Sequence, residues 1–222
     1  MSSQQVPHPD QDGRTFIAGP GLNEAGRARL FGVFQAERPV EKVELYGDKE
    51  SRKVQVLRDL KETLGLTDTA QIVYPGSSTD VSVARVFGQD NVTHVEPDEG
   101  RCKLLIGSGY RAIATRIEDY QPEQPADVIV AFNSYGELTP DILQGMLNPG
   151  GVVIANNYTG WAHDLARMPG MELIAAVWPD YDREDAAIYR GEDIPEDIAV
   201  GGTTEEEPRY PDALCVFRFA PI

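Results

Sequence analysis

The stretch Gln71-Ile72-Val73-Tyr74-Pro75-Gly76-Ser77-Ser78-Thr79-Asp80 decides the fold that this sequence predicts. It joins a short apolar run to a glycine-containing turn, and a helix-forming segment, 80–87, follows at once. The next apolar run, Val92-Thr93-His94-Val95-Glu96, ends in a carboxylate. Short apolar runs bounded by turn residues are typical of buried strands. Together these segments predict a strand–helix–strand unit with parallel strands.

The same alternation continues toward the end of the chain. Further strands are predicted at 111–117, 127–132, 152–155, 171–178 and 213–219. Helices are predicted at 99–106, 140–147 and 159–168, the first capped by Asp98 and the second by Thr139 with Pro140 at its first position. Asn148–Gly151 is predicted to be a tight turn, and the acidic, Pro- and Gly-rich segment 180–212 a long loop or lid. Right-handed crossovers then place helices on both faces of a doubly wound α/β sheet.

The first third of the chain has a different character. Residues 1–14 are polar and are predicted to be a disordered tail. Residues 15–69 are predicted to be a helical cap segment, with helices at 22–35 and 54–64. Asp48 is the expected N-cap of the second helix, and Gly65 is expected to end it. The Rossmann-like domain is therefore predicted to occupy residues 70–222.

Length and charge restrict the function. The chain has 222 residues, and its formal net charge is 20 − 36 = −16. One domain is expected at this length. A surface this acidic repels a phosphate backbone, so no nucleic-acid partner is expected. The sequence contains no apolar run of membrane-spanning length and no secretory leader, which predicts no membrane association and a cytoplasmic location.

The acidic excess comes with very few lysines. Five Lys (Lys42, Lys49, Lys53, Lys61 and Lys103) leave 20 − 5 = 15 Arg. This bias favours adaptation to concentrated salt, where repulsion is screened within a few ångströms, over an ordinary acidic protein. Unfolding followed from low to molar KCl should therefore show a rising midpoint. A midpoint that does not change with KCl would contradict salt adaptation.

The cysteines indicate neither a disulfide framework nor a metal centre. Cys102 and Cys215 are far apart in sequence, and neither has a CxxC partner or an adjacent His. We expect both to be buried thiols and expect no metal site.

The order of motifs resembles the class I S-adenosylmethionine-dependent methyltransferases. Residues 73–80 resemble motif I of that family, the turn after its first strand, and 92–96 resemble motif II. Residues 126–132 resemble motif IV, and 147–153 resemble the turn into the fifth strand. The resemblance covers 70–222 and implies a mostly parallel seven-stranded sheet with an antiparallel last strand.

The resemblance also implies S-adenosylmethionine as cofactor and assigns residues to it. The turn would contribute Tyr74, Gly76, Ser77 and Ser78, with backbone N–H groups reaching the methionine carboxylate. Glu96 would accept hydrogen bonds from the ribose diol. Glu118 and Asp119 would lie near the adenine. Asn133, after the fourth strand, would face the sulfonium and the acceptor. Further catalytic candidates are Tyr135 and His163, the latter as an imidazole base.

Motif I departs from the family pattern. Tyr74 stands where the family has an acidic residue, and Ser78 and Asp80 stand where it has its second and third glycines. Two hypotheses follow: a methyltransferase acting on a small-molecule acceptor, or a catalytically inactive methyltransferase-like domain that binds a ligand or a protein. A nicotinamide-dependent oxidoreductase ranks below both because Gly-x-Gly-x-x-Gly is absent after the first strand. The sequence leaves the acceptor and the oligomeric state open.

Overall fold

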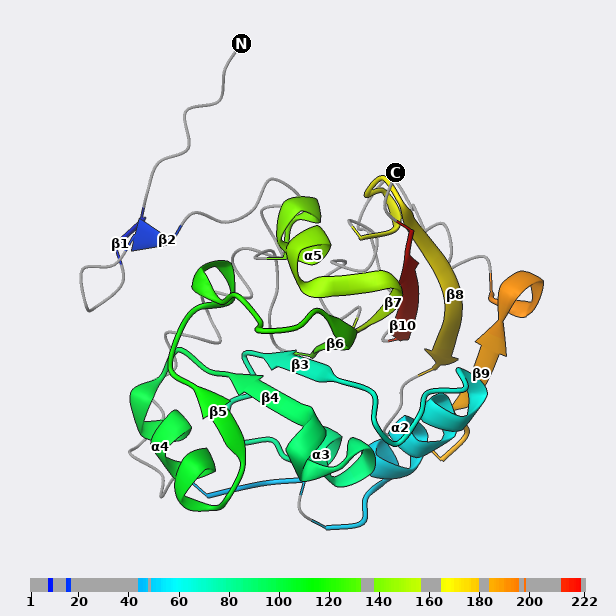
Figure 1. Ribbon diagram of the computed structural model, residues 1–222. Helices are drawn as coiled ribbons and strands as arrows, with labels where there is room; N and C mark the ends of the chain where they lie inside the picture. Colours follow the sequence, from blue (N-terminus) through cyan, green and yellow to red (C-terminus); the bar gives the residue numbers. More distant parts are fainter. Residues whose placement is uncertain are drawn as a thin grey trace.

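A single eight-stranded sheet organises the part of the chain that the computed structural model describes, residues 8–9, 15–16, 44–47, 49–132, 138–156, 165–179, 184–195, 198 and 213–220. Its strands are β3 (Ile72–Pro75), β4 (Val92–Val95), β5 (Arg111–Ile113), β6 (Ala126–Ala131), β7 (Leu147–Asn156), β8 (Met171–Trp178), β9 (Ala187–Arg190) and β10 (Leu214–Phe219). They lie in the order β5-β4-β3-β6-β7-β10-β8-β9 (Figure 1).

The sheet has a parallel part and an antiparallel part. The five strands from β5 to β7 are parallel to one another, and β9 is antiparallel to β8. β10 is antiparallel to both β7 and β8, between which it lies. Apart from β9, this is the strand order of the class I methyltransferase fold. The predicted doubly wound, mostly parallel sheet with an antiparallel last strand is therefore confirmed.

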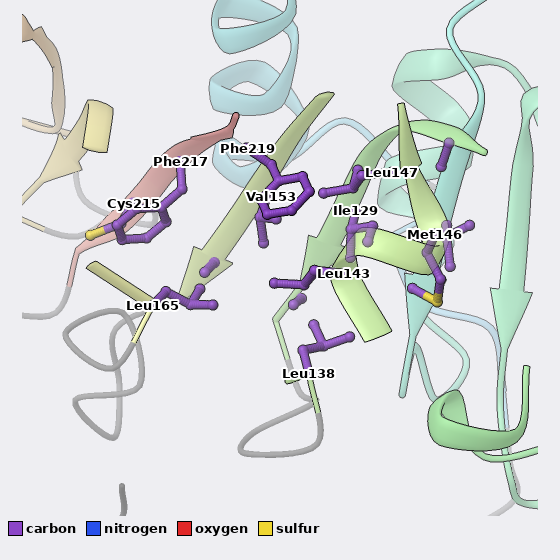
Figure 2. Packing of buried hydrophobic residues seen from close by; sticks show 14 of the residues in the cluster. Ile129, Leu138, Leu143, Met146, Leu147, Val153, Leu165, Cys215, Phe217 and Phe219 are labelled. Carbon is purple, nitrogen blue, oxygen red and sulfur yellow. The ribbon is translucent and has the colours of Figure 1, made fainter. Parts of the chain in front are cut away.

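Helices cover both faces of the sheet, as the alternation of buried residues along each strand requires. In β6, Ile129 belongs to one core, and its neighbours Val128 and Val130 belong to the other. The helix α5 (Pro140–Met146) covers the first core through Leu143 and Met146. Figure 2 shows these two side chains gathered with residues of β6, β7 and β10.

The second core lies under α2 (Arg52–Thr63) and α3 (Ser82–Phe87). Val56, Leu57 and Leu60 of α2 pack there, at the three-to-four-residue spacing of one helix face. The N-cap of α2 is Ser51 rather than the predicted Asp48, since the Ser51 hydroxyl accepts from the Val54 N–H at 3.3 Å. Before α2, residues 44–47 lie beside the turn that follows β3.

Local capping signals elsewhere are confirmed. The Asp98 carboxylate accepts from Arg101 N–H at 2.9 Å and begins α4 (Glu99–Gly107). Thr139 caps α5, whose first residue is Pro140. Both cysteines are buried and free, as predicted. No helix among the described residues is long and apolar enough to span a bilayer.

Two predicted boundaries are wrong because pairing extends beyond the apolar runs. The predicted tight turn at 148–151 lies within the bounds of β7, where the pairing with β6 shifts register between Leu147, the partner of Ala126, and Val152, the partner of Val128. Asn148 stabilises this entry by donating to the Asp127 carboxylate at 2.9 Å. Within the predicted lid, β9 pairs with β8 and gives the sheet an eighth strand where seven were expected.

Two further segments differ from expectation. The predicted strand at 111–117 ends at Ile113, and the 3-10 helix η2 (Ile117–Asp119) follows it. β1 (His8–Pro9), within the predicted tail, pairs with β2 (Thr15–Phe16), which lies just after that tail. The predicted helix at 22–35 and most of the one at 159–168 lie outside the described residues.

Candidate cofactor site

The turn after β3 lies where the order of strands reverses. From β3 the chain runs outward to β4 and β5, and it then returns to β6 on the other side of β3. Ligands of doubly wound sheets bind outside the carboxyl ends of the strands at such a point. The loops after β3, β4 and β5 carry the residues that the sequence singled out.

The turn itself is shaped by two residues with left-handed backbone. Gly76 has φ 56°, and its N–H donates to the Val95 carbonyl at 2.8 Å. Ser78 has φ 55°, the one non-glycine residue with positive φ in the described parts of the chain. A non-glycine residue in this conformation is uncommon, so surrounding contacts must hold it.

Glu96 provides that contact. Its side chain is buried at the end of β4, and one carboxylate oxygen accepts from the Ser78 N–H at 2.7 Å. The other accepts from the Asp98 N–H at 3.1 Å, and Arg101 lies 3.9 Å away. Burial raises the pKa of Glu96, and these backbone donors and Arg101 counteract it only in part. A carboxylate has about four acceptor directions, so two remain for a ligand's hydroxyl groups.

Asp80 is a structural carboxylate. It is 1% exposed, and it accepts from the Tyr74 hydroxyl at 2.7 Å and the Ser82 N–H at 2.9 Å. Lys53 of α2 forms an ion pair with it. Burial would raise the pKa of Asp80, but the charge and hydrogen bond of Lys53, with the other donors, hold it below the usual range.

This cluster explains two departures from motif I. The Tyr74 side chain is fully buried on the α2–α3 face of the sheet, and its hydroxyl is directed to Asp80. The structure therefore gives this side chain a structural contact instead of a surface open to a ligand. Asp80 fills the third glycine position because its carboxylate ties α2 to the turn. No local pattern points to Lys53 as the partner of Asp80, because it lies 27 residues before it.

Three other buried polar side chains have no hydrogen-bond partner among the described residues. They are Ser77, Ser82 and His94. The His94 ring lies beside the rings of Tyr74, at 5.6 Å between centroids, and Tyr110, at 5.8 Å. His94 is thus packed in the core, within reach of the charge of Asp80.

Acid should destabilise the protein through His94. Burial lowers its pKa from 6.5 to about 4, although the charge of Asp80 opposes the shift. Between these two pH values His94 is protonated in the unfolded chain but not in the folded chain. The free energy of unfolding therefore falls as pH drops from 6.5 toward 4, by up to about 3 kcal/mol. Urea unfolding of the wild type and of His94→Leu across this window measures it. If both proteins lose the same stability between pH 6.5 and 4, His94 is not the cause.

The acidic residues after β5 are exposed. Glu118 and Asp119 end the 3-10 helix η2, which Ile117 anchors in the core. Glu118 pairs with Arg116 at 3.5 Å. Both carboxylates belong to the loop that follows β5, the edge strand beside β4. Of the other predicted residues, Asn133, Tyr135 and His163 lie outside the described part of the chain.

Comparisons with known proteins add a likeness to the fold. No protein-family model and no curated protein matches the sequence. TrmN from Thermus thermophilus is a similar solved structure, at 20% identity and a TM-score of 0.47, covering 75% of this chain and 48% of its own. An S-adenosylmethionine-dependent methyltransferase from Thermotoga maritima has 14% identity and a TM-score of 0.48, covering 77% of this chain and 91% of its own. The N-methyltransferase NodS from Bradyrhizobium japonicum has 13% identity and a TM-score of 0.44, covering 76% and 97%.

The chain spans about half the length of TrmN. The likeness concerns the fold alone. The fold class rests on the strand order of the sheet.

Proposed function

We propose that this protein is an S-adenosylmethionine-dependent methyltransferase acting on a small-molecule acceptor. The observation that carries the proposal is the buried Glu96 carboxylate at the carboxyl end of β4, bonded to the turn after β3 at 2.7 Å. It lies at the reversal of strand order, in a fold whose ligands bind there.

The described residues offer a chemically suitable set of contacts for this cofactor. Glu96 would accept from the ribose diol through its remaining acceptor directions. The Ser77 N–H would donate to the methionine carboxylate, because the Gly76 N–H already donates to the Val95 carbonyl. The buried Ser77 hydroxyl, which has no hydrogen-bond partner among the described residues, adds a further polar group. Asp119 would accept from the adenine amino group.

The cofactor supplies an activated methyl group, so the chain mainly has to align the acceptor and exclude water. We propose that Asn133 and Tyr135 orient the acceptor after β6 and that His163 takes up a proton where the acceptor must lose one. The segments before β3 and between β8 and β10 would cover the acceptor. A net charge of −16 disfavours a nucleic-acid acceptor and suits a neutral or cationic small molecule.

The alternative is a methyltransferase-like domain without catalysis. It draws support from the altered motif I, in which the Tyr74 hydroxyl and the Asp80 carboxylate are bonded to each other at 2.7 Å. The strained Ser78 backbone, where a glycine would be relaxed, points the same way.

Calorimetric titration of the wild type with S-adenosylmethionine and S-adenosylhomocysteine, in molar KCl, separates the two. Saturable one-site binding of both is expected, and an acceptor screen would follow. Neither heat nor a thermal shift, on protein shown to be folded by circular dichroism, would favour the inactive domain.

A further inference from the structure

A short strap crosses the turn after β3. Residues 44–47 lie beside 79–81: the Tyr46 N–H donates to the Thr79 carbonyl at 3.1 Å, and the Tyr46 carbonyl accepts from the Val81 N–H at 2.9 Å. The Thr79 hydroxyl donates to the Glu44 carbonyl at 2.7 Å. Residues 44–47 are thus fixed to the turn of the candidate cofactor site by three hydrogen bonds.

Gly47 lets the strap approach this closely. Its φ is 78°, and a Cβ built there would lie 2.5 Å from an Asp80 carboxylate oxygen and 2.7 Å from the Ser82 nitrogen. Neither atom can move freely, since Asp80 is held by its own donors and Ser82 begins α3. The backbone after Tyr46 is therefore defined by close packing against the turn.

This geometry presents the Tyr46 side chain at the carboxyl edge of the sheet. Tyr46 is 46% exposed, whereas Tyr74 in β3 is fully buried. The Tyr46 phenol reaches back to the turn: burial of its oxygen and the charge of Asp80 raise its pKa to about 12, while neighbouring Ser78 and Arg101 oppose the shift. Glu96 is also within electrostatic reach of this phenol.

The phenol of Tyr46 therefore lies near Ser78 and Glu96, while nearly half of the residue is exposed. A large aromatic residue held by backbone on both sides loses little conformational freedom when it contacts a ligand. Tyr46 therefore combines a large exposed area with a position near Glu96.

We propose that Tyr46 is a cofactor-binding residue whose ring covers the ribose end of the S-adenosyl group held by Glu96. The inference rests on the proposed function and adds the strap 44–47 to the site. In this arrangement the face of the Tyr46 ring contacts the cofactor, and its hydroxyl contacts the turn after β3.

Two variants and a footprint test this inference. Tyr46→Ala should weaken S-adenosylhomocysteine binding at least tenfold in calorimetry, and Tyr46→Phe, which keeps the ring, should stay within about threefold. Hydroxyl-radical footprinting of the wild type should show Tyr46 oxidised several-fold more slowly at saturating S-adenosylhomocysteine. Ile106, 54% exposed near the far end of α4, is the internal control for the footprint, and Ile106→Ala is the matched variant.

The outcomes separate this inference from the function on which it rests. If the wild type binds S-adenosylhomocysteine while Tyr46 stays equally reactive, the ring does not cover the ligand and the proposal is wrong, although the proposed function stands. If the wild type does not bind at all, both fail. Protection of Tyr46 supports the proposal even where Tyr46→Ala unfolds, because the footprint uses the wild-type chain.

Discussion

Asp80→Ala should lower the free energy of unfolding by about 3 to 5 kcal/mol, the range for breaking a buried ion pair by removing one partner. Asp80 is 1% exposed and is the shared acceptor for Lys53, the Tyr74 hydroxyl and the Ser82 N–H. The Lys53 side chain is 18% exposed, so its ammonium stays largely shielded from water when the carboxylate is removed. Urea unfolding at fixed KCl measures the loss.

Paired variants show whether the charge itself matters. Lys53→Met should be strongly destabilising because it leaves the Asp80 carboxylate buried without its ion pair. Lys53→Met combined with Asp80→Asn should recover part of that loss, since the amide oxygen can still accept from the Ser82 N–H and the amide NH2 can donate to the Tyr74 hydroxyl oxygen. Strictly additive effects of the single variants would show that Lys53 and Asp80 act independently.

The pH dependence of this cluster has a definite sign. The pKa of Asp80 lies below its ordinary value of 3.8 in the folded chain. Its contribution to stability is therefore present above the unfolded pKa and is lost as pH falls below it. That window lies below the one in which His94 acts, so acid unfolding of the wild type should have two components. His94→Leu should remove only the component at higher pH.

Glu96→Ala should weaken S-adenosylhomocysteine binding at least about 100-fold. Two hydrogen bonds from a ribose diol to a buried carboxylate contribute roughly 1.5 to 3 kcal/mol each. The same substitution removes the acceptor that holds the Ser78 N–H at 2.7 Å, so the turn loses its support as well. Calorimetric titration of folded variant protein measures the loss.

Two variants separate ligand contact from support of the turn. Glu96→Gln keeps one amide oxygen that can accept from the turn but loses the charge, and we expect binding between wild type and Glu96→Ala. Asp98→Ala is the matched control, because Asp98 follows Glu96 by two residues yet uses its carboxylate to cap α4. Equal loss in Asp98→Ala and Glu96→Ala would show that the effect is local destabilisation. Unchanged affinity in Glu96→Ala would remove this residue from the site.

Several elements were predictable because their signals are local. Because side chains alternate along β6, Ile129 packs in one core and its neighbours Val128 and Val130 pack in the other. Thr139 followed by Pro140 begins α5, and Asp98 begins α4, as expected of N-caps. A cap and its helix lie within four residues, so short stretches of sequence suffice.

Glu96 illustrates how far such reasoning reaches into the site. Its place at the end of a strand, 18 residues after Ser78, was visible in the sequence. That its carboxylate is buried and bonded to Ser78 N–H was not visible, because burial and hydrogen bonding depend on how the loops after β3 and β4 meet. Glu118 and Asp119 were also visible in the sequence as acidic residues after a strand. Their exposure was not, because it depends on how their loop lies against the rest of the protein.

The sequence by itself determined the parallel α/β core, its caps and the acidic strand end, because these depend on periodicity and on contacts between near neighbours. Tertiary structure alone decided the eighth strand, the ion pair of Lys53 with Asp80 and the strap that presents Tyr46. Each of these joins segments far apart in the chain. β9 is a strand because the edge of β8 offers unpaired backbone groups, and Asp80 is tolerated in a buried turn because α2 brings a cation to it.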